Sequence, residues 1–380
     1  MRIVFWQNCL SPHQLPYICE LMNDNRVDVV DIVVGETLSN NRKTMGWELP
    51  QELDGKFHIE GGNVYIQPNE DEIESLLKNR VNDSVHFFSG IRGFPFVYRA
   101  FRTSLKYNLK RGIITERPNT YAFGLANGKP LWLHKMRFFF QDKKYVPYIH
   151  FIFAVGEECA DYYSSISNNW KIFPFAYCTA PQTIDINVEN CNYNIKTQAN
   201  INILYVGTLA WWKGIDSLLS ALKGHNYISV DLIGDGQQRR ELEQMVSKLQ
   251  LQNVHFMGYK KNSDLLPIMT SHDILILPSV YDGWGAVVNE ALMNGLFVIC
   301  SNKCGAKDLI RDKRLGMVFK GGNSKELSDY LSCAEQHITE IRQNRMFRQK
   351  WAEEHIGGKA ISRYMVNCLN AEGIMPPWRQ

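Results

Sequence analysis

Short apolar runs alternate with helix-like stretches in two series along this 380-residue chain, and that alternation constrains the fold more than any other feature. In the first series we expect strands at 3–6, 27–34, 64–66, 85–88, 112–115 and 151–155. In the second we expect strands at 201–206, 229–233, 254–257, 274–277 and 297–300, with helices at 215–222 and 240–249. The alternation predicts an α/β fold with two doubly wound, Rossmann-like domains, whose ligands bind beyond the carboxyl ends of the strands.

A polar segment without hydrophobic periodicity separates the two series and predicts a linker at 179–199. The chain is well above the ~150 residues that serve as a guide for one domain. We therefore predict an N-terminal domain at 1–178 and a C-terminal domain at 200–350. Apolar residues at near-helical spacing then predict a terminal helix within 351–380.

Composition narrows the class of protein. Hydrophobic residues make up 45% of the chain and charged residues 21%, which excludes extensive disorder. The nine cysteines form no Cys-x-x-Cys pair, and no nearby histidine completes a zinc site with Cys300 and Cys304, so we expect reduced thiols and no metal. The N-terminus lacks a secretion signal, and no run reaches the ~18 apolar residues of a spanning helix. We expect a cytoplasmic protein, soluble or peripheral at the inner face of the cytoplasmic membrane.

A basic, aromatic-rich block lies in the first half of the chain. Residues 91–145 hold 12 Lys and Arg against 2 Asp and Glu, whereas residues 1–90 hold 7 against 14. The cations and aromatic side chains of 99–111 and 129–144 suit an anionic membrane surface or a lipid diphosphate. Alternatively, the two segments are a helical pair with its aromatic side chains in the core and its cations in solvent. The pI of 8.3 and the lack of a recognised binding module argue against nucleic acid.

The segment 281–295 carries the strongest signal for a ligand. Asp282 and Glu290 flank a glycine-containing turn that leads into a helix expected to start near Ala286. The free backbone N–H groups at such a start suit a phosphate, and Glu290 suits a ribose diol. The alternative is that Asp282 only caps the helix and Glu290 lies on a solvated face.

This segment resembles the paired-acid signature of retaining glycosyltransferases of the GT-B fold, family 4, also called glycosyl transferases group 1. The segments 205–214 and 232–236 resemble the phosphate-binding loop and the next strand and turn of that family. Gly258, 277–279 and 305–306 follow in the expected order. The resemblance is dense over roughly residues 200–350 and implies two lobes around a cleft, with the terminal helix returning to the first lobe.

The resemblance also implies roles for individual residues. Lys213 would contact the donor diphosphate, Glu290 the ribose and Asp282 the transferred sugar. The donor cradle would further comprise Gly207, Thr208, Gly234, Gly258, Tyr259, Gly283, Trp284, Gly285, Ala286 and Val287. Thr208 stands where the family commonly has Arg, so either a neighbouring cation compensates or Lys213 and the helix end suffice.

The first half of the chain offers weaker candidates for the acceptor side. Residues 11–17 resemble the opening of bacterial polysaccharide-assembly members of the family. There His13 is expected to contact the acceptor or the donor sugar, unless it is a surface loop histidine. His86, in an expected strand, is a further catalytic candidate, and Glu116 and Arg117 follow another strand end.

Together with the resemblance, these features predict transfer of a sugar from a UDP- or GDP-linked donor to a hydroxyl of a lipid-linked glycan acceptor. Retention at the anomeric carbon is implied by the family resemblance alone. We expect neither a metal nor another cofactor, and a place in O-antigen or capsule assembly. A sugar-nucleotide epimerase of the same fold and a non-catalytic carbohydrate-binding relative stay as alternatives. An NAD-dependent oxidoreductase is also possible, although Arg239 stands where a dinucleotide fingerprint would need a third glycine.

Overall fold

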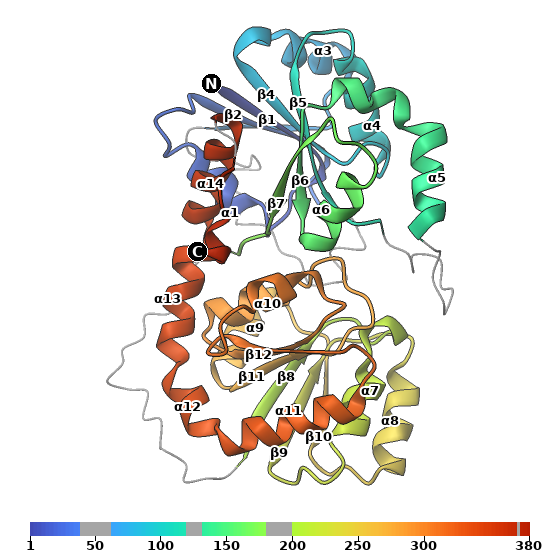
Figure 1. The fold of residues 1–380 in the computed structure, drawn as a ribbon, viewed down its shortest axis with the longest axis vertical. Coiled ribbons are helices and arrows are strands. Elements are labelled where there is room, and N and C mark those ends of the chain that lie inside the picture. The colour runs from blue at the N-terminus through green and yellow to red at the C-terminus, as the bar shows by residue number, and fades with distance from the viewer. Residues whose placement is uncertain (39–61, 119–130, 180–199, 371–372) are drawn as a thin grey trace. The chain divides into compact units, whose positions relative to one another are not determined.

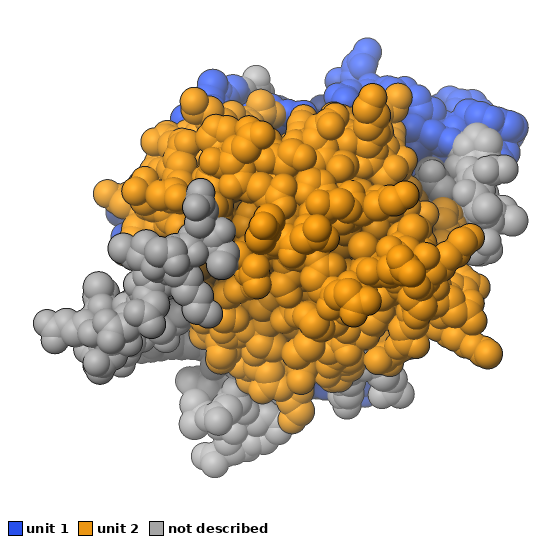
Figure 2. Space-filling model, turned by 90° about the horizontal axis from the view of Figure 1, so that it is seen from below, with its two compact units in different colours: residues 1–180, 355–380 blue, residues 181–354 orange. Residues whose placement is uncertain are grey.

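The computed structural model describes residues 1–38, 62–118, 131–179, 200–370 and 373–380. Two compact units divide the chain: unit 1 comprises Met1–Ala180 with His355–Gln380, and unit 2 comprises Pro181–Glu354. Figure 2 colours the two units separately. The predicted linker at 179–199 lies outside the described residues except for Thr179.

Unit 1 is built on a seven-stranded sheet with the order β3-β2-β1-β4-β5-β6-β7, and every neighbouring pair is parallel (Figure 1). Its strands are β1 (Arg2–Cys9), β2 (Val29–Glu36), β3 (Gly62–Ile66), β4 (Ser84–Ser89), β5 (Lys110–Glu116), β6 (Phe151–Val155) and β7 (Lys171–Phe175). Its helices are α1 (Leu15–Leu21), α3 (Glu70–Lys78), α4 (Pro95–Ser104), α5 (Leu131–Gln141), α6 (Glu157–Ser164) and α14 (Gly358–Asn370).

Unit 2 repeats this plan with a six-stranded parallel sheet of order β10-β9-β8-β11-β12-β13. Its strands are β8 (Ile201–Val206), β9 (Ile228–Ile233), β10 (Val254–Gly258), β11 (Ile274–Leu277), β12 (Phe297–Ser301) and β13 (Gly316–Phe319). Its helices are α7 (Ile215–Ala221), α8 (Arg239–Lys248), α9 (Asn262–Thr270), α10 (Val287–Met293), α11 (Ser324–Gln336), α12 (Ile338–Gln343) and most of α13 (Arg345–Ile356).

Strands β7 and β13 were not among the expected strands. Each lies at an edge of its sheet. Pro174 interrupts the β7 pattern, and an edge strand tolerates a proline because one side needs no ladder hydrogen bonds. The four residues of β13 begin with Gly316, whose added Cβ would lie 2.1 Å from the Val298 carbonyl oxygen, so close strand pairing requires glycine there.

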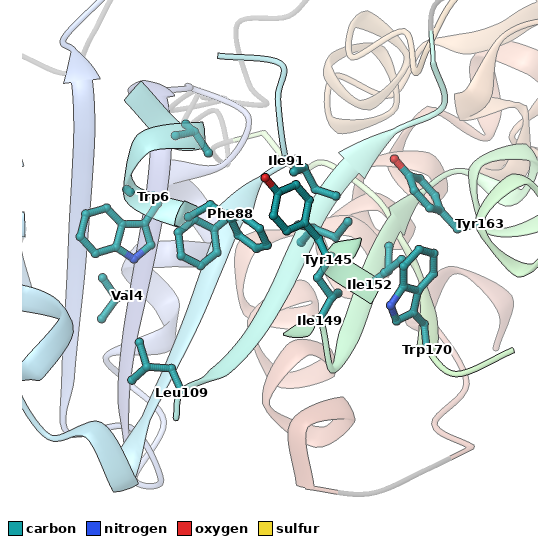
Figure 3. Close-up of a cluster of buried hydrophobic side chains, with 14 of the residues drawn as sticks. Val4, Trp6, Phe88, Ile91, Leu109, Tyr145, Ile149, Ile152, Tyr163 and Trp170 are labelled. Atoms are coloured by element: carbon teal, nitrogen blue, oxygen red, sulfur yellow. The ribbon is translucent and has the colours of Figure 1, made fainter. Parts of the chain in front are cut away.

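The core of unit 1 is a cluster of aromatic and branched side chains between the sheet and its helices (Figure 3). Trp6 stacks on Phe88 with ring centroids 5.9 Å apart, and both side chains are fully buried. Phe101 of α4 meets Phe88 edge-to-face at 5.2 Å. Burial on both faces explains why these strands have near-continuous apolar runs.

The C-terminal helix α14 completes unit 1 by packing on α1. An added Cβ at Gly358 would lie 2.6 Å from the Pro16 carbonyl oxygen, so the two helices approach at their backbones. Tyr364 Oη donates to the Pro174 carbonyl at 2.9 Å, and Lys110 Nζ donates to the Leu369 carbonyl at 3.0 Å. These contacts join the last residues of the chain to strands formed by the first 180.

Candidate functional site

The carboxyl ends of the parallel strands in unit 2 lie at one edge of the sheet, and the loops that follow them are bonded together there. Gly207 N donates to the Ile233 carbonyl at 2.9 Å, and Gly234 N donates to the Gly258 carbonyl at 2.9 Å. Gly234 has φ +132°, and an added Cβ would lie 1.9 Å from the Gly207 carbonyl oxygen. Only glycine allows this approach, so three of the predicted cradle residues form one backbone cluster.

A second pair of loops, after β8 and after β11, meets beside this cluster. The Trp212 carbonyl accepts hydrogen bonds from Val280 N at 2.9 Å and Tyr281 N at 3.2 Å. Gly214 adopts φ +64°, and an added Cβ would lie 2.3 Å from the Pro278 carbonyl oxygen. The backbone therefore brings Lys213 next to Asp282.

Lys213 and Asp282 form the central ion pair of the site. Lys213 Nζ lies 2.6 Å from Asp282 Oδ2, and the two side chains are 19% and 13% exposed. Partial burial strengthens such a pair relative to one in open water, because the effective dielectric is lower. Asp282 does not cap α10, because Ala286 is the N-cap residue and no side chain makes a capping hydrogen bond to that helix. The capping alternative is therefore wrong.

The turn after β12 supports Asp282 from the other side. Asp282 N donates to the Lys303 carbonyl at 3.1 Å, and Gly305 N donates to the Asp282 carbonyl at 3.2 Å. An added Cβ at Gly305 would lie 2.3 Å from the Gly283 carbonyl oxygen. Sequence reasoning assigned this turn only a place in the family order, although a glycine after a strand end is a signal for close backbone approach.

The predicted donor cradle at 283–287 is held by buried contacts. Trp284 Nε1 donates to Asn289 Oδ1 at 2.8 Å inside the unit, and Ala306 N donates to the Trp284 carbonyl at 2.7 Å. Gly285 has φ +89°, with an added Cβ 2.7 Å from Cys304 Sγ. Helix α10 begins at Val287, as expected from its sequence, and runs for seven residues.

Glu290 lies one turn into α10, between Asn289, Ala291 and Leu292, which are all buried. Its own side chain is partly buried. Burial raises the pKa of its carboxyl group to about 7, because desolvation disfavours the charged form. Partial burial and the raised pKa favour a site position over a fully solvated face, and the role of Glu290 stays a prediction.

Thr208 and Tyr259 complete the predicted set in unit 2. The Thr208 carbonyl accepts a hydrogen bond from Tyr205 Oη at 2.9 Å, which fixes the start of the loop without adding a charge. Tyr259 is 44% exposed after β10. Arg239 approaches the same region, since its Nη1 lies 3.8 Å from the position of an added Cβ at Gly258, and it pairs with Asp235 and Glu243.

The histidine candidates of unit 1 are buried. His86 is 0% exposed on β4, where Trp6 Nε1 donates to its Nδ1 at 3.1 Å and its Nε2 lies 3.0 Å from Ser84 Oγ. Burial lowers the pKa of His86 to about 3, so it is neutral. Both ring nitrogens are engaged within the core, which contradicts a catalytic role for His86. His13 is 9% exposed after β1, so it is not a surface histidine, and its role stays a prediction.

Glu116 and Arg117 at the end of β5 make contacts within unit 1. Tyr177 Oη donates to Glu116 Oε1 at 3.0 Å, and Arg117 forms an ion pair with Glu158 of α6. These contacts link β5 to neighbouring segments and give the two residues a structural use.

In the described ranges, no group of three or more His, Cys, Asp or Glu side chains is arranged to hold a metal ion. Within the same ranges, no helix has the length and apolar character needed to cross a bilayer.

Comparison with known proteins shows what the chain resembles. Residues 192–350 match the family described as Glycosyl transferases group 1. An uncharacterised 41.2 kDa protein in the cps region of Klebsiella pneumoniae is 28% identical over 279 residues, which is 70% of this chain and 73% of that protein. The lipopolysaccharide glucosyltransferase WaaG of Escherichia coli is 32% identical over 140 residues, and the match spans only 36% of its length.

Among solved structures, Anabaena HepE in complex with UDP superposes with a TM-score of 0.69 at 15% identity, over 97% of this chain and 100% of the other. The same protein in complex with UDP-glucose superposes with a TM-score of 0.65 at 15% identity, over 97% of this chain and 99% of the other. These findings confirm the predicted α/β fold of the GT-B class and the resemblance to glycosyl transferases group 1.

Proposed function

We propose that this protein is a glycosyltransferase of the GT-B fold. It would move a hexose or related sugar from a UDP- or GDP-linked donor to a hydroxyl of a lipid-linked glycan, with retention. The observation that carries the proposal is the Lys213–Asp282 ion pair at the strand-end edge of unit 2. The complexes of HepE with UDP and UDP-glucose support a nucleotide-sugar donor. The Klebsiella cps-region protein and WaaG support a role in bacterial surface polysaccharide assembly.

The reaction requires charge to be stabilised at two points. As the bond between the anomeric carbon and the diphosphate oxygen breaks, negative charge grows on the leaving diphosphate, and Lys213 is placed on the loop that would stabilise it. Positive charge grows on the sugar ring, where Asp282 supplies a carboxylate. The acceptor oxygen forms the new bond to the anomeric carbon, the electron pair of the broken bond leaves with the diphosphate, and the hydroxyl proton passes to an oxygen of that leaving diphosphate.

Glu290 is assigned to the ribose of the donor, and Glu290→Ala tests that assignment. At pH 8 most of the Glu290 carboxyl group is ionised, and a hydrogen bond to a charged group contributes roughly 1.5–3 kcal/mol, so the affinity for the nucleoside diphosphate at that pH should fall about tenfold or more. Calorimetric titration with UDP and GDP measures it. Glu335→Ala, in helix α11 of the same unit and bonded to His225, is the matched control and should bind as the wild type does. Unchanged affinity in Glu290→Ala would remove Glu290 from the donor site.

The raised pKa of Glu290 gives the same assignment a dependence on pH. An ionised carboxylate accepts hydrogen bonds from both hydroxyls of a diol, so nucleotide affinity should rise severalfold between pH 6 and 8, as the pKa of about 7 is passed. The stability of the folded unit changes in the opposite direction. Its folded-state pKa is raised, so this group's stabilising contribution is full below its ordinary pKa and is lost as the pH rises through about 7. Glu290→Gln should flatten both profiles.

Turnover should not require a divalent metal. The acids of the proposed site are Asp282, which is paired with Lys213, and Glu290, whose raised pKa disfavours the charge that Mg²⁺ prefers in its ligands. Saturating EDTA should leave the rate of sugar transfer unchanged, as measured by release of the nucleoside diphosphate. Loss of activity in EDTA and its recovery with Mg²⁺ or Mn²⁺ would overturn the proposed mechanism.

A panel of UDP- and GDP-linked sugars, screened by thermal unfolding, identifies the donor, because a ligand at 100 times its Kd stabilises the folded state by about 2.7 kcal/mol. The product then separates the proposal from its rivals. A transferase releases nucleoside diphosphate rapidly when an acceptor is present, and slowly without one, by transferring the sugar to water. An epimerase converts the sugar nucleotide without any acceptor, and a binding protein converts nothing.

A further inference from the structure

Helix α5 of unit 1 has apolar side chains that the core does not use. Phe138 is the one buried residue among its eleven, and it meets Trp170 edge-to-face with ring centroids 5.7 Å apart. Five large apolar residues of α5 are exposed, with Phe140 at 75%, Trp132 at 57%, Phe139 at 56%, Met136 at 45% and Leu133 at 38%. Figure 1 shows α5 at the periphery of unit 1.

The exposed residues form a single face. Trp132, Met136 and Phe139 are spaced by four and three residues, as are Leu133, Met136 and Phe140 by three and four, so all five lie along one side of the helix. Phe138 points the other way, into the core. We call these five residues the α5 apolar face. Contiguous apolar surface of this kind marks an interaction site on a folded protein.

Cations surround the α5 apolar face. Arg137 is exposed on the helix itself, and Lys143 and Lys144 are exposed just beyond its end. Lys143 Nζ lies 4.2 Å from the centroid of the Phe139 ring, so an ammonium group sits directly on the apolar face. Lys144, the next residue, is also exposed and lies over Tyr145. We call Arg137, Lys143 and Lys144 the basic rim.

Acidic side chains do not offset this charge. Between residues 131 and 148 the acid is Asp142, and it is paired with Arg92. The sequence left open whether the aromatic residues of this block belong to the core. The structure divides them: Phe138 belongs to the core, whereas Trp132, Phe139 and Phe140 do not.

We propose that α5 docks unit 1 on an anionic lipid bilayer, with the α5 apolar face in the interface and the basic rim on the lipid headgroups. A short helix with Trp, Phe and Leu on one side and Lys and Arg beside it lies in the plane of such an interface. Lysine is depleted in protein–protein interfaces, so a rim containing two lysines favours a lipid surface over a protein partner. The inference is independent of the donor assignment, and its test needs no nucleotide.

The test is flotation of the full chain with vesicles of phosphatidylcholine alone or mixed with phosphatidylglycerol, at low and high salt. The wild type should bind the anionic vesicles at low salt and lose binding as salt screens the headgroups. Phe139→Ser with Phe140→Ser should lower binding at least tenfold. Lys143→Gln with Lys144→Gln should lower it about thirtyfold at low salt and weaken its salt dependence.

Matched controls come from exposed residues of unit 2. Tyr227→Ser with Met346→Ser removes two apolar groups that are 67% and 66% exposed, and Lys313→Gln with Lys350→Gln removes two exposed cations. Both controls should bind as the wild type does, and thermal unfolding should show all variants folded.

Three results would overturn the proposal. One is equal binding by the α5 phenylalanine variant and the wild type. Another is equal wild-type binding to neutral and anionic vesicles, or binding to neither. The third is that the α5 variants change their oligomeric state in sedimentation experiments while their vesicle binding stays unchanged, which would make the α5 apolar face a protein interface.

Discussion

Lys213→Ala is expected to lower kcat/KM by about two to three orders of magnitude, because removing one preorganised group that stabilises transition-state charge costs about 10²–10³ in rate. Lys213 is the cation that the loop after β8 brings to the strand-end edge of unit 2, and Thr208 in the same loop adds no charge. The rate of nucleoside diphosphate release in steady state measures the effect. Affinity for the free nucleoside diphosphate should fall as well, since Lys213 is assigned to its phosphates.

Lys223→Ala is the control for this result, because Lys223 is an exposed lysine at the end of helix α7 in the same unit. It should leave kcat/KM within a factor of two. If Lys213→Ala lost less than tenfold while remaining folded, Lys213 would not act on the leaving group. Its ion pair with Asp282 would then be only a link between two loops.

Asp282→Asn is expected to lower kcat about a hundredfold while leaving the affinity for the nucleoside diphosphate within about threefold. The carboxylate is assigned to the transferred sugar, and its charge matters most when the ring becomes positive. Single-turnover kinetics and calorimetry of the same variant separate the two effects.

Because Asp282 is paired with Lys213, the same experiment also tests whether Asp282 only positions Lys213. If Asp282 only positions Lys213, Asp282→Asn should weaken nucleotide affinity as much as Lys213→Ala does. The double variant should then be no worse than either single variant. Additive losses in kcat would instead assign the two side chains to separate charges in the transition state.

Much of the fold could be predicted from the sequence, because a parallel sheet covered on both faces needs strands of continuous apolar residues. The apolar runs at 85–88 and 274–277 predict such strands, and both lie in strands of the structure. The hydrogen-bond partners of polar residues within such buried strands lie largely on other strands, so a local sequence pattern does not predict them. His86 follows Val85 in an apolar run, and nothing in that run indicates that Trp6 of β1 donates a hydrogen bond to its ring. Its core position could not be distinguished from a site position without the neighbouring strand.

The strand-end positions of the candidate site residues in unit 2 could be read from the sequence, but their contacts could not. Glycines at 207, 214, 234 and 305 stand after strand ends, where sequence reasoning looks for close backbone approach. The ion pair joins residues 69 positions apart, and its formation depends on how two loops meet. The pKa of Glu290 likewise depends on what covers α10, which no local pattern specifies.

The division of unit 1 in the sequence has a consequence for biosynthesis. Helix α1 is made among the first residues, yet α14, which covers it, is made among the last described ones. Unit 2 is continuous between them, so it can fold before unit 1 is complete. At about 5–20 residues per second, the nascent chain presents an uncovered α1 for roughly tens of seconds. The part synthesised first is therefore finished last, and in that interval it is the part most in need of a chaperone.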